Sequence, residues 1–253
     1  MALTYSATNL VNCGSAATLD DLTTGTRILW VYLTTVNGRL MEKASNSRFD
    51  ANTGGNLELL IGRATTSMNY ISVGSTVTTN AWQCVACTYD IGGNVGKIYI
   101  GTLTTPMAEV SYTTTTAGSG ALTSDAASSL IIGNRASGAF THQGAIADVA
   151  IFNRVLSLGE LRDWQFNPRK LTGCVGFWRL GSNGTTNVPD LSGNFNTGSI
   201  TGTTVSAHVP VRSFRMGRSS IRSPGGYTAP AYTPTDYGIP RGVTRGVIGG
   251  AIV

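Results

Sequence analysis

Six short β-rich stretches follow one another over residues 26 to 154, and no stretch with a helical period separates them. They cover residues 26–35, 56–63, 82–90, 96–103, 128–135 and 144–154, and Gly, Asn, Asp or Ser residues border each one. A parallel sheet would need a helical crossover between consecutive strands, and this sequence shows no pattern for one. The chain is therefore predicted to be all-β, with two antiparallel sheets packed as a sandwich.

One helix is predicted directly after the last of these stretches, within the sequence LSLGELRDWQF. Ser157 is followed three residues later by Glu160, which is the spacing of a capping box, where each side chain satisfies the free backbone amide of the other residue. We expect this helix to close an edge or an end of the sandwich.

The four cysteines are Cys13, Cys84, Cys87 and Cys174. Cys84 and Cys87 have the C-x-x-C spacing of a redox pair or half a zinc site, but they lie in a predicted strand, where residues three apart point to opposite faces. The two histidines, His142 and His208, stand apart and offer no second ligand pair. We expect buried, reduced thiols, with a disulfide and then a metal site as the alternatives, and no cofactor.

No stretch of the sequence approaches the roughly 18 apolar residues of a membrane-spanning helix. The first residues, MALTYSATNLVNCG, lack the basic and apolar regions of a secretory signal peptide. The sequence thus predicts neither membrane insertion nor secretion through a cleaved signal, and reduced cysteines fit synthesis in a reducing cytoplasm.

Two motifs resemble a known family. AWQCVACTYDIGGNVGKIYIGTL, residues 81–103, resembles the paired strands of laminin-G-like domains, which have a concanavalin A-like jelly roll. LIIGNRASGAFTHQGAIADVAIFNRVLSLGEL, residues 130–161, resembles the end of such domains, where a Gly-rich loop leads to a G-x-I-x-D-V strand and a short capped helix. The resemblance covers most of residues 1–210 and implies a jelly-roll sandwich, a fold that hosts lectins, glycosidases and structural modules.

A segment similar to the first strand and turn of this family occurs late in this chain, as VGFWRLGSNGTTNVPDLSGNFNTGSITG at residues 175–202. The termini of compact domains often lie close together, so a strand can move from one end of the sequence to the other and keep its place. We expect a circularly permuted domain over residues 1–210, in which residues 173–210 supply the closing strands. The alternative is a strand donated to a neighbouring subunit.

No catalytic site is predicted. Glycoside hydrolysis needs two carboxylates around the scissile bond, and glucanases of this fold carry them at alternate positions of one strand. The four glutamates are Glu42, Glu58, Glu109 and Glu160, and none has an acidic residue two positions away. The sequence GGNVGK, residues 92–97, lacks the Ser or Thr that follows the lysine of a phosphate loop, so we expect a hairpin turn there.

A weak candidate for a glycan or ion site is the loop PDLSGNFNTG. Its oxygen-bearing residues at alternate positions are Asp190, Ser192, Asn194 and Asn196. The same short polar residues around Gly193 are typical of a tight turn, and the structural interpretation is favoured.

A second candidate is the stretch ILWVYL, where Ile28, Trp30 and Tyr32 share one face and offer a surface on which a sugar could stack. The opposite face of the same stretch is equally apolar, which favours a central strand buried on both sides.

The last 43 residues differ from the rest of the chain. Six arginines and Asp236 give this segment a charge of +5, which is the net charge of the whole chain, so residues 1–210 are neutral. The prolines favour an extended or polyproline conformation, and three tyrosines recur every five residues between them. We predict a partner-binding arm over residues 211–253, with a solvated disordered tail as the alternative. Its predicted contact residues are Arg212, Arg215, Arg218, Arg222, Tyr227, Tyr232, Tyr237, Arg241 and Arg245.

Two functions remain. Compact laminin-G-like domains followed by a short arm resemble auxiliary proteins of tailed bacteriophages. This resemblance implies a non-enzymatic structural protein of the virion, on the capsid or a tail appendage, which binds other virion proteins through its arm and forms a homo-oligomer. The alternative is a cell-surface, lectin-like carbohydrate-binding module, and both functions coexist if the virion domain binds host glycans. Nucleic acid is a weaker candidate, because the arm has no lysine and no known recognition module.

Overall fold

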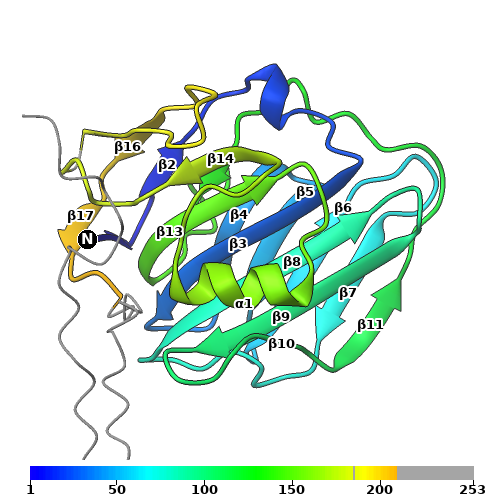
Figure 1. The fold of residues 1–253 in the computed structure, drawn as a ribbon, viewed down its shortest axis with the longest axis horizontal. Helices are drawn as coiled ribbons and strands as arrows, with labels where there is room; N and C mark the ends of the chain where they lie inside the picture. The colour runs from blue at the N-terminus through cyan, green and yellow to red at the C-terminus, as the bar shows by residue number, and fades with distance from the viewer. Residues whose placement is uncertain (185, 210–253) are drawn as a thin grey trace, which may run out of the picture. The chain divides into compact units, whose positions relative to one another are not determined.

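The computed structural model describes residues 1–184 and 186–209, which form two antiparallel sheets (Figure 1). The strands of the first sheet are β1 (Ala2–Tyr5), β3 (Thr24–Leu33), β8 (Trp82–Asp90), β9 (Val95–Thr102), β10 (Ala108–Glu109), β13 (Gly144–Phe152), β14 (Cys174–Trp178) and β17 (Thr204–Ser206). Those of the second are β2 (Leu10–Asn12), β4 (Gly38–Ala44), β5 (Ser47–Asn52), β6 (Asn56–Ile61), β7 (Met68–Ser72), β11 (Tyr112–Thr116), β12 (Ile131–Ile132), β15 (Asn187–Val188) and β16 (Gly198–Thr201). The chain also forms the 3-10 helix η1 (Ala17–Leu19) and the helix α1 (Leu158–Phe166).

The predicted all-β antiparallel sandwich is confirmed. The first sheet has the order β10-β9-β8-β3-β13-β1-β17, with β14 also paired to β13. The second has the order β11-β7-β6-β5-β4-β12-β2-β16-β15. Within the described residues, no helix is long and apolar enough to cross a membrane.

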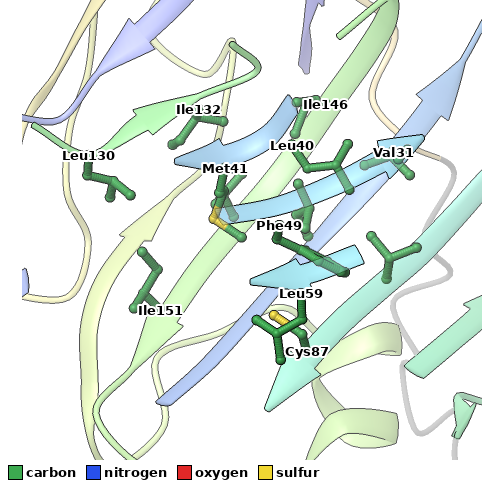
Figure 2. Packing of buried hydrophobic residues seen from close by; sticks show 14 of the residues in the cluster. Val31, Leu40, Met41, Phe49, Leu59, Cys87, Leu130, Ile132, Ile146 and Ile151 are labelled. Carbon is green, nitrogen blue, oxygen red and sulfur yellow. The ribbon is translucent and has the colours of Figure 1, made fainter. Parts of the chain in front are cut away.

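The core lies between the two sheets. Figure 2 shows Phe49, Leu59 and Cys87 packed together there, with Met41 and Ile146 nearby. Cys84 belongs instead to a second apolar cluster on the opposite face of the first sheet, so the C-x-x-C pair is split between two faces, as the strand alternation predicts. All four cysteines are free and buried, and burial raises the pKa of the Cys87 thiol to about 12, which keeps it protonated and unreactive.

The helix α1 covers a face of the first sheet, so the expectation that it closes an edge or an end was wrong. Its Leu161 and Trp164 are buried in the second apolar cluster, and Figure 1 shows α1 in front of β3, β8 and β9. The indole Nε1 of Trp30 donates a hydrogen bond to the backbone oxygen of Gln165 at 3.1 Å. The physical reason is that β3, β8 and β13 are apolar on both faces, and the outer face must also be covered. The predicted capping box of Ser157 and Glu160 is present.

The late segment that resembles a first strand lies within the same two sheets as the rest of the chain. β14 pairs with β13, β16 pairs with β2, and β17 pairs with β1. β1 and β14 adjoin the same side of β13, because Gly144–Ile146 faces β1 and Val149–Phe152 faces β14. The circular permutation stays a prediction. The domain boundary at residue 210 also stays a prediction, because the arm lies outside the described residues.

The stretch 128–135 forms a much shorter strand than predicted, namely β12. Gly133 then adopts a φ of 79°, a left-handed conformation that ends the strand. The buried Asn134 side chain accepts hydrogen bonds from the backbone amides of Arg135 and Phe140, and so shapes a loop.

Candidate functional site

The predicted contact residues of the arm all lie beyond residue 209, outside the described residues. They are Arg212, Arg215, Arg218, Arg222, Tyr227, Tyr232, Tyr237, Arg241 and Arg245. The interpretation of this segment as a partner-binding arm remains a prediction.

The loop around Asp190 uses its polar side chains within the protein. The Asp190 carboxylate accepts hydrogen bonds from the backbone amides of Phe177, Ser192 and Asn196 at 2.8 to 3.0 Å, and from the Ser192 hydroxyl at 2.8 Å. The Asn194 and Asn196 side chains both donate to the backbone oxygen of Val175. Among the described residues, no three His, Cys, Asp or Glu side chains gather as a metal site. These contacts account for all four residues as parts of a structural turn.

The stretch ILWVYL is the central strand β3, between β8 and β13. Ile28 and Trp30 are fully buried beneath α1, so they cannot form the sugar-stacking surface that their shared face suggested. Tyr32, on the same face and nearer the end of the strand, is only half-buried. The helix therefore covers two of the three side chains and leaves the third accessible.

Tyr32 forms an aromatic pair with Trp82, the first residue of β8. The two residues are direct partners in the register of β3 and β8, and their ring centroids lie 5.7 Å apart with a tilt of 58° between the ring planes. The sequence contains both residues but not their pairing, because the register joins positions 50 residues apart. This pair was missed, although the predicted strands carried both residues.

The aromatic pair borders a cavity of about 240 Å³, which we call the aromatic groove. Its lining residues are Thr4, Tyr32, Thr34, Trp82, Gly144, Ala145, Ser206 and Ala207, and none of them is charged. Gly144 has a φ of 136°, and a Cβ there would lie 1.9 Å from the Tyr32 backbone oxygen, so only glycine fits. The groove thus combines aromatic walls, a floor of very small residues and several hydroxyl groups.

One wall of the aromatic groove comes from the end of the described chain, at Ser206 and Ala207. β17 pairs with β1, and the next residue, His208, contacts the buried Asp148 through Nε2 and Oδ2 at 2.8 Å. Val209 is then buried in the apolar cluster beneath α1. Strand pairing, the contact of His208 with Asp148 and the burial of Val209 hold this wall in place, so the groove is preformed.

The outer face of the second sheet carries an alternating chain of charges, which we call the ion-pair chain. Arg39 Nε lies 3.1 Å from Glu42 Oε2 and 3.1 Å from Asp50 Oδ1. Arg48 then contacts Asp50 at 3.0 Å and Glu58 at 3.1 Å. The order is Glu42, Arg39, Asp50, Arg48 and Glu58, across β4, β5 and β6.

Asp50 and Glu58 are direct cross-strand partners, so two carboxylates do meet on this face. They lie eight positions apart in the sequence, on neighbouring strands, so the spacing along a single strand missed this pair. Burial raises the pKa of Asp50 to about 6, although Arg39 and Arg48 act in the opposite direction. Only 2% of Asp50 is exposed, so it has little access to a substrate.

The model of the "concanavalin A-like lectin/glucanases superfamily" (Laminin_G_3) matches residues 6–162. No protein of curated function matches the sequence significantly.

Solved structures resemble this chain at low sequence identity. A proposed carbohydrate binding protein from Bacteroides ovatus superposes with a TM-score of 0.59 and 16% identity, over 83% of this chain and 61% of that protein. This chain thus spans about three fifths of its relative. The enzymatically active domain of tailspike protein 2 of bacteriophage CBA120 superposes with a TM-score of 0.47 and 15% identity, over 68% of this chain and 28% of that one. A pentraxin from Limulus polyphemus superposes with a TM-score of 0.42 and 11% identity, over 66% of this chain and 82% of that one.

Proposed function

The chain belongs to the concanavalin A-like lectin/glucanase superfamily, and on that premise we propose that it binds carbohydrate in the aromatic groove without cleaving it. The observation that carries the proposal is the in-register pair of Tyr32 and Trp82 beside a floor without large side chains. A pyranose ring has a face of C–H groups and a rim of hydroxyls. The ring face would pack on the aromatic pair, and the hydroxyls would meet those of Thr4, Thr34 and Ser206.

The chemistry of the groove favours a neutral sugar. No charged residue lines it, so a uronic acid or sialic acid would lose water without gaining an ionic partner. The Ser206 hydroxyl is buried and has no hydrogen-bond partner among the described residues, so it would gain one if its side chain rotated toward a ligand hydroxyl. Binding without cleavage is supported by the ion-pair chain, because arginine contacts each of its carboxylates.

Replacing Trp82 with alanine is expected to weaken the binding of a neutral glycan at least tenfold. Loss of a central aromatic contact at a binding site typically costs about 2 kcal/mol, which exceeds the roughly 1.4 kcal/mol of a tenfold change. A neutral-glycan array identifies the ligand, and calorimetry compares the variants. The matched control is Phe195→Ala, which removes an aromatic side chain that is 88% exposed in the loop between β15 and β16.

Equal affinity of the Trp82→Ala variant and the wild type would reject the groove as the site. Equal weakening by Phe195→Ala would show that aromatic area alone, and not this pair, is responsible. If no neutral glycan binds the wild-type protein, the proposed function itself is wrong. Glycans recovered uncut after incubation would support binding without hydrolysis.

We also propose that the chain is a structural component of a bacteriophage virion, on the capsid or a tail appendage, and that host glycans are its carbohydrate ligands. The charge distribution favours this second function, because a neutral body and an arm of +5 separate glycan binding from attachment. The arm would bind other virion proteins, and the protein would act as a homo-oligomer. Four buried free thiols are consistent with synthesis in the host cytoplasm.

Removing residues 211–253 is expected to leave a folded sandwich that no longer joins particles. Replacing Tyr227, Tyr232 and Tyr237 with alanine should weaken attachment more than replacing three of the arginines, because buried tyrosine anchors contribute about 2 kcal/mol whereas exposed ion pairs contribute less than about 1 kcal/mol. Quantitative immunogold labelling of particles measures occupancy. Incorporation of the truncated protein at wild-type occupancy would contradict the proposed role of the arm.

A further inference from the structure

The outer face of the second sheet also carries a cavity of about 410 Å³, which we call the Glu42 pocket. Val11 and Ile132 point into the core, so their neighbours Leu10, Asn12 and Ile131 point outward, where they line this pocket. Ser45, Ser128 and Ser129 supply hydroxyl groups at other positions of the lining. The pocket therefore offers two large apolar side chains, three alanines, one amide and several hydroxyls around its charged residues.

Glu42 is the only carboxylate among the described residues that line the pocket, and only 6% of the residue is exposed. Its neighbour Lys43 does not neutralise it, because Lys43 Nζ contacts Asp20 Oδ1 at 2.6 Å and the backbone oxygen of Ser128. Within the described part of the chain, Glu42 Oε2 is buried and accepts no hydrogen bond, and Arg39 is the one ionic contact of Glu42. Glu42 is thus a nearly buried acceptor with unused capacity.

The charges of the ion-pair chain show why the unused acceptor capacity of Glu42 favours a cation. It holds three carboxylates and two guanidinium groups, so it begins and ends with a negative charge. At one end Asn52 Nδ2 donates to Glu58 Oε2 at 2.7 Å, which caps that carboxylate. At the other end Glu42 faces the pocket without a cap. A cation placed beside Glu42 would give the ion-pair chain as many positive as negative charges.

We infer that the Glu42 pocket binds the ammonium group of an amino sugar. A buried carboxylate with a single ionic partner is stabilised by a second one, and an ammonium group donates up to three hydrogen bonds. The C–H face of the sugar would pack against Leu10 and Ile131, while its hydroxyls would meet Asn12 and the serines. A divalent metal ion fits less well, since it needs about six oxygen ligands and the pocket offers one carboxylate.

The pocket lies on the second sheet and the aromatic groove on the first, so the inference does not depend on binding in the groove.

The test uses the full chain and a β-linked glucosamine trisaccharide, with its fully N-acetylated counterpart as the uncharged comparison. Calorimetry in a buffer that keeps the amines protonated is expected to show binding of the glucosamine trisaccharide, and, in the Trp82→Ala variant with its impaired aromatic groove, at least tenfold weaker binding of the N-acetylated one. Glu42→Gln, which keeps the shape and removes the charge, should raise the Kd of the glucosamine trisaccharide at least tenfold. Glu58→Gln, at the capped end of the same ion-pair chain, should change it less than about twofold, since that residue does not line the pocket.

Two further variants keep the result decisive. Ala136→Trp changes an exposed residue of the pocket lining, so it should block the pocket without disturbing the ion-pair chain, even if Glu42→Gln fails to fold. Trp82→Ala should leave glucosamine binding unchanged. Wild-type affinity in both Glu42→Gln and Ala136→Trp overturns the inference, as does an equal loss in Glu58→Gln or a loss in Trp82→Ala. Absence of glucosamine binding by the wild-type protein overturns it as well, whether or not neutral glycans bind.

Discussion

Replacing Asp190 with alanine is expected to lower the free energy of unfolding by about 3 kcal/mol or more. The carboxylate of Asp190 accepts hydrogen bonds from three backbone amides and one hydroxyl, and it thereby joins β14 to the loop between β15 and β16. Hydrogen bonds to a charged acceptor each contribute roughly 1.5 to 3 kcal/mol, and the amides left without a partner add to the loss. Chemical denaturation of the full chain measures the change.

Two comparisons make this result specific. Asp190→Asn keeps one acceptor oxygen, so it should lose about half as much stability as Asp190→Ala. Asn183→Ala removes an exposed side chain from the same segment and should change the free energy of unfolding by less than about 0.5 kcal/mol. If calcium raised the melting temperature of the wild type and Asp190→Ala abolished that shift, the loop would be an ion site and not a structural turn.

The sequence predicted the apolar strands well, because their pattern is local. β8 was predicted with its observed limits, and the capping box placed the start of α1. The strands β4 and β5 were missed because charged residues replace apolar ones on their outer face. In β5, Arg48 and Asp50 alternate with the core residues Phe49 and Ala51, and that alternation is the signal that could have identified the strand.

Both candidate sites depend on information that no local pattern contains. The aromatic groove requires the register of β3 against β8, and the Glu42 pocket requires β2, β12 and β4 to be neighbours. In each case side chains from distant parts of the sequence meet only after the sheets have formed. The identities of the residues were visible in the sequence, whereas their partners were set by the topology.

The last prediction concerns two buried groups with opposite pKa shifts. Burial raises the pKa of Asp50 from its usual 3.8 to about 6, and burial lowers the pKa of His142 from its usual 6.5 to about 4. Between about pH 4 and pH 6 the folded protein therefore holds a proton on Asp50 that the unfolded chain has released, which makes stability fall as the pH rises. Over the same range the unfolded chain holds a proton on His142 that the folded protein lacks, which makes stability rise with pH.

These two effects are expected to cancel in the wild type and to separate in single variants. Asp50→Asn should leave a free energy of unfolding that rises by up to about 1.4 kcal/mol per pH unit between pH 4 and 6, and His142→Gln should leave one that falls by a similar amount. Both variants will also lose stability at every pH, but that loss changes the level of the profile and not its slope. Urea denaturation at a series of pH values measures the slopes.

The difference between the two variant profiles isolates these groups, because every other titratable group contributes to both variants and largely cancels. The double variant should return to a slope close to that of the wild type. Parallel profiles in the two single variants would show that Asp50 and His142 do not differ in the way described. Opposite slopes would instead show that the middle carboxylate of the ion-pair chain holds a proton near pH 5, since Asp50 is its most buried carboxylate and burial is the largest cause of its shift.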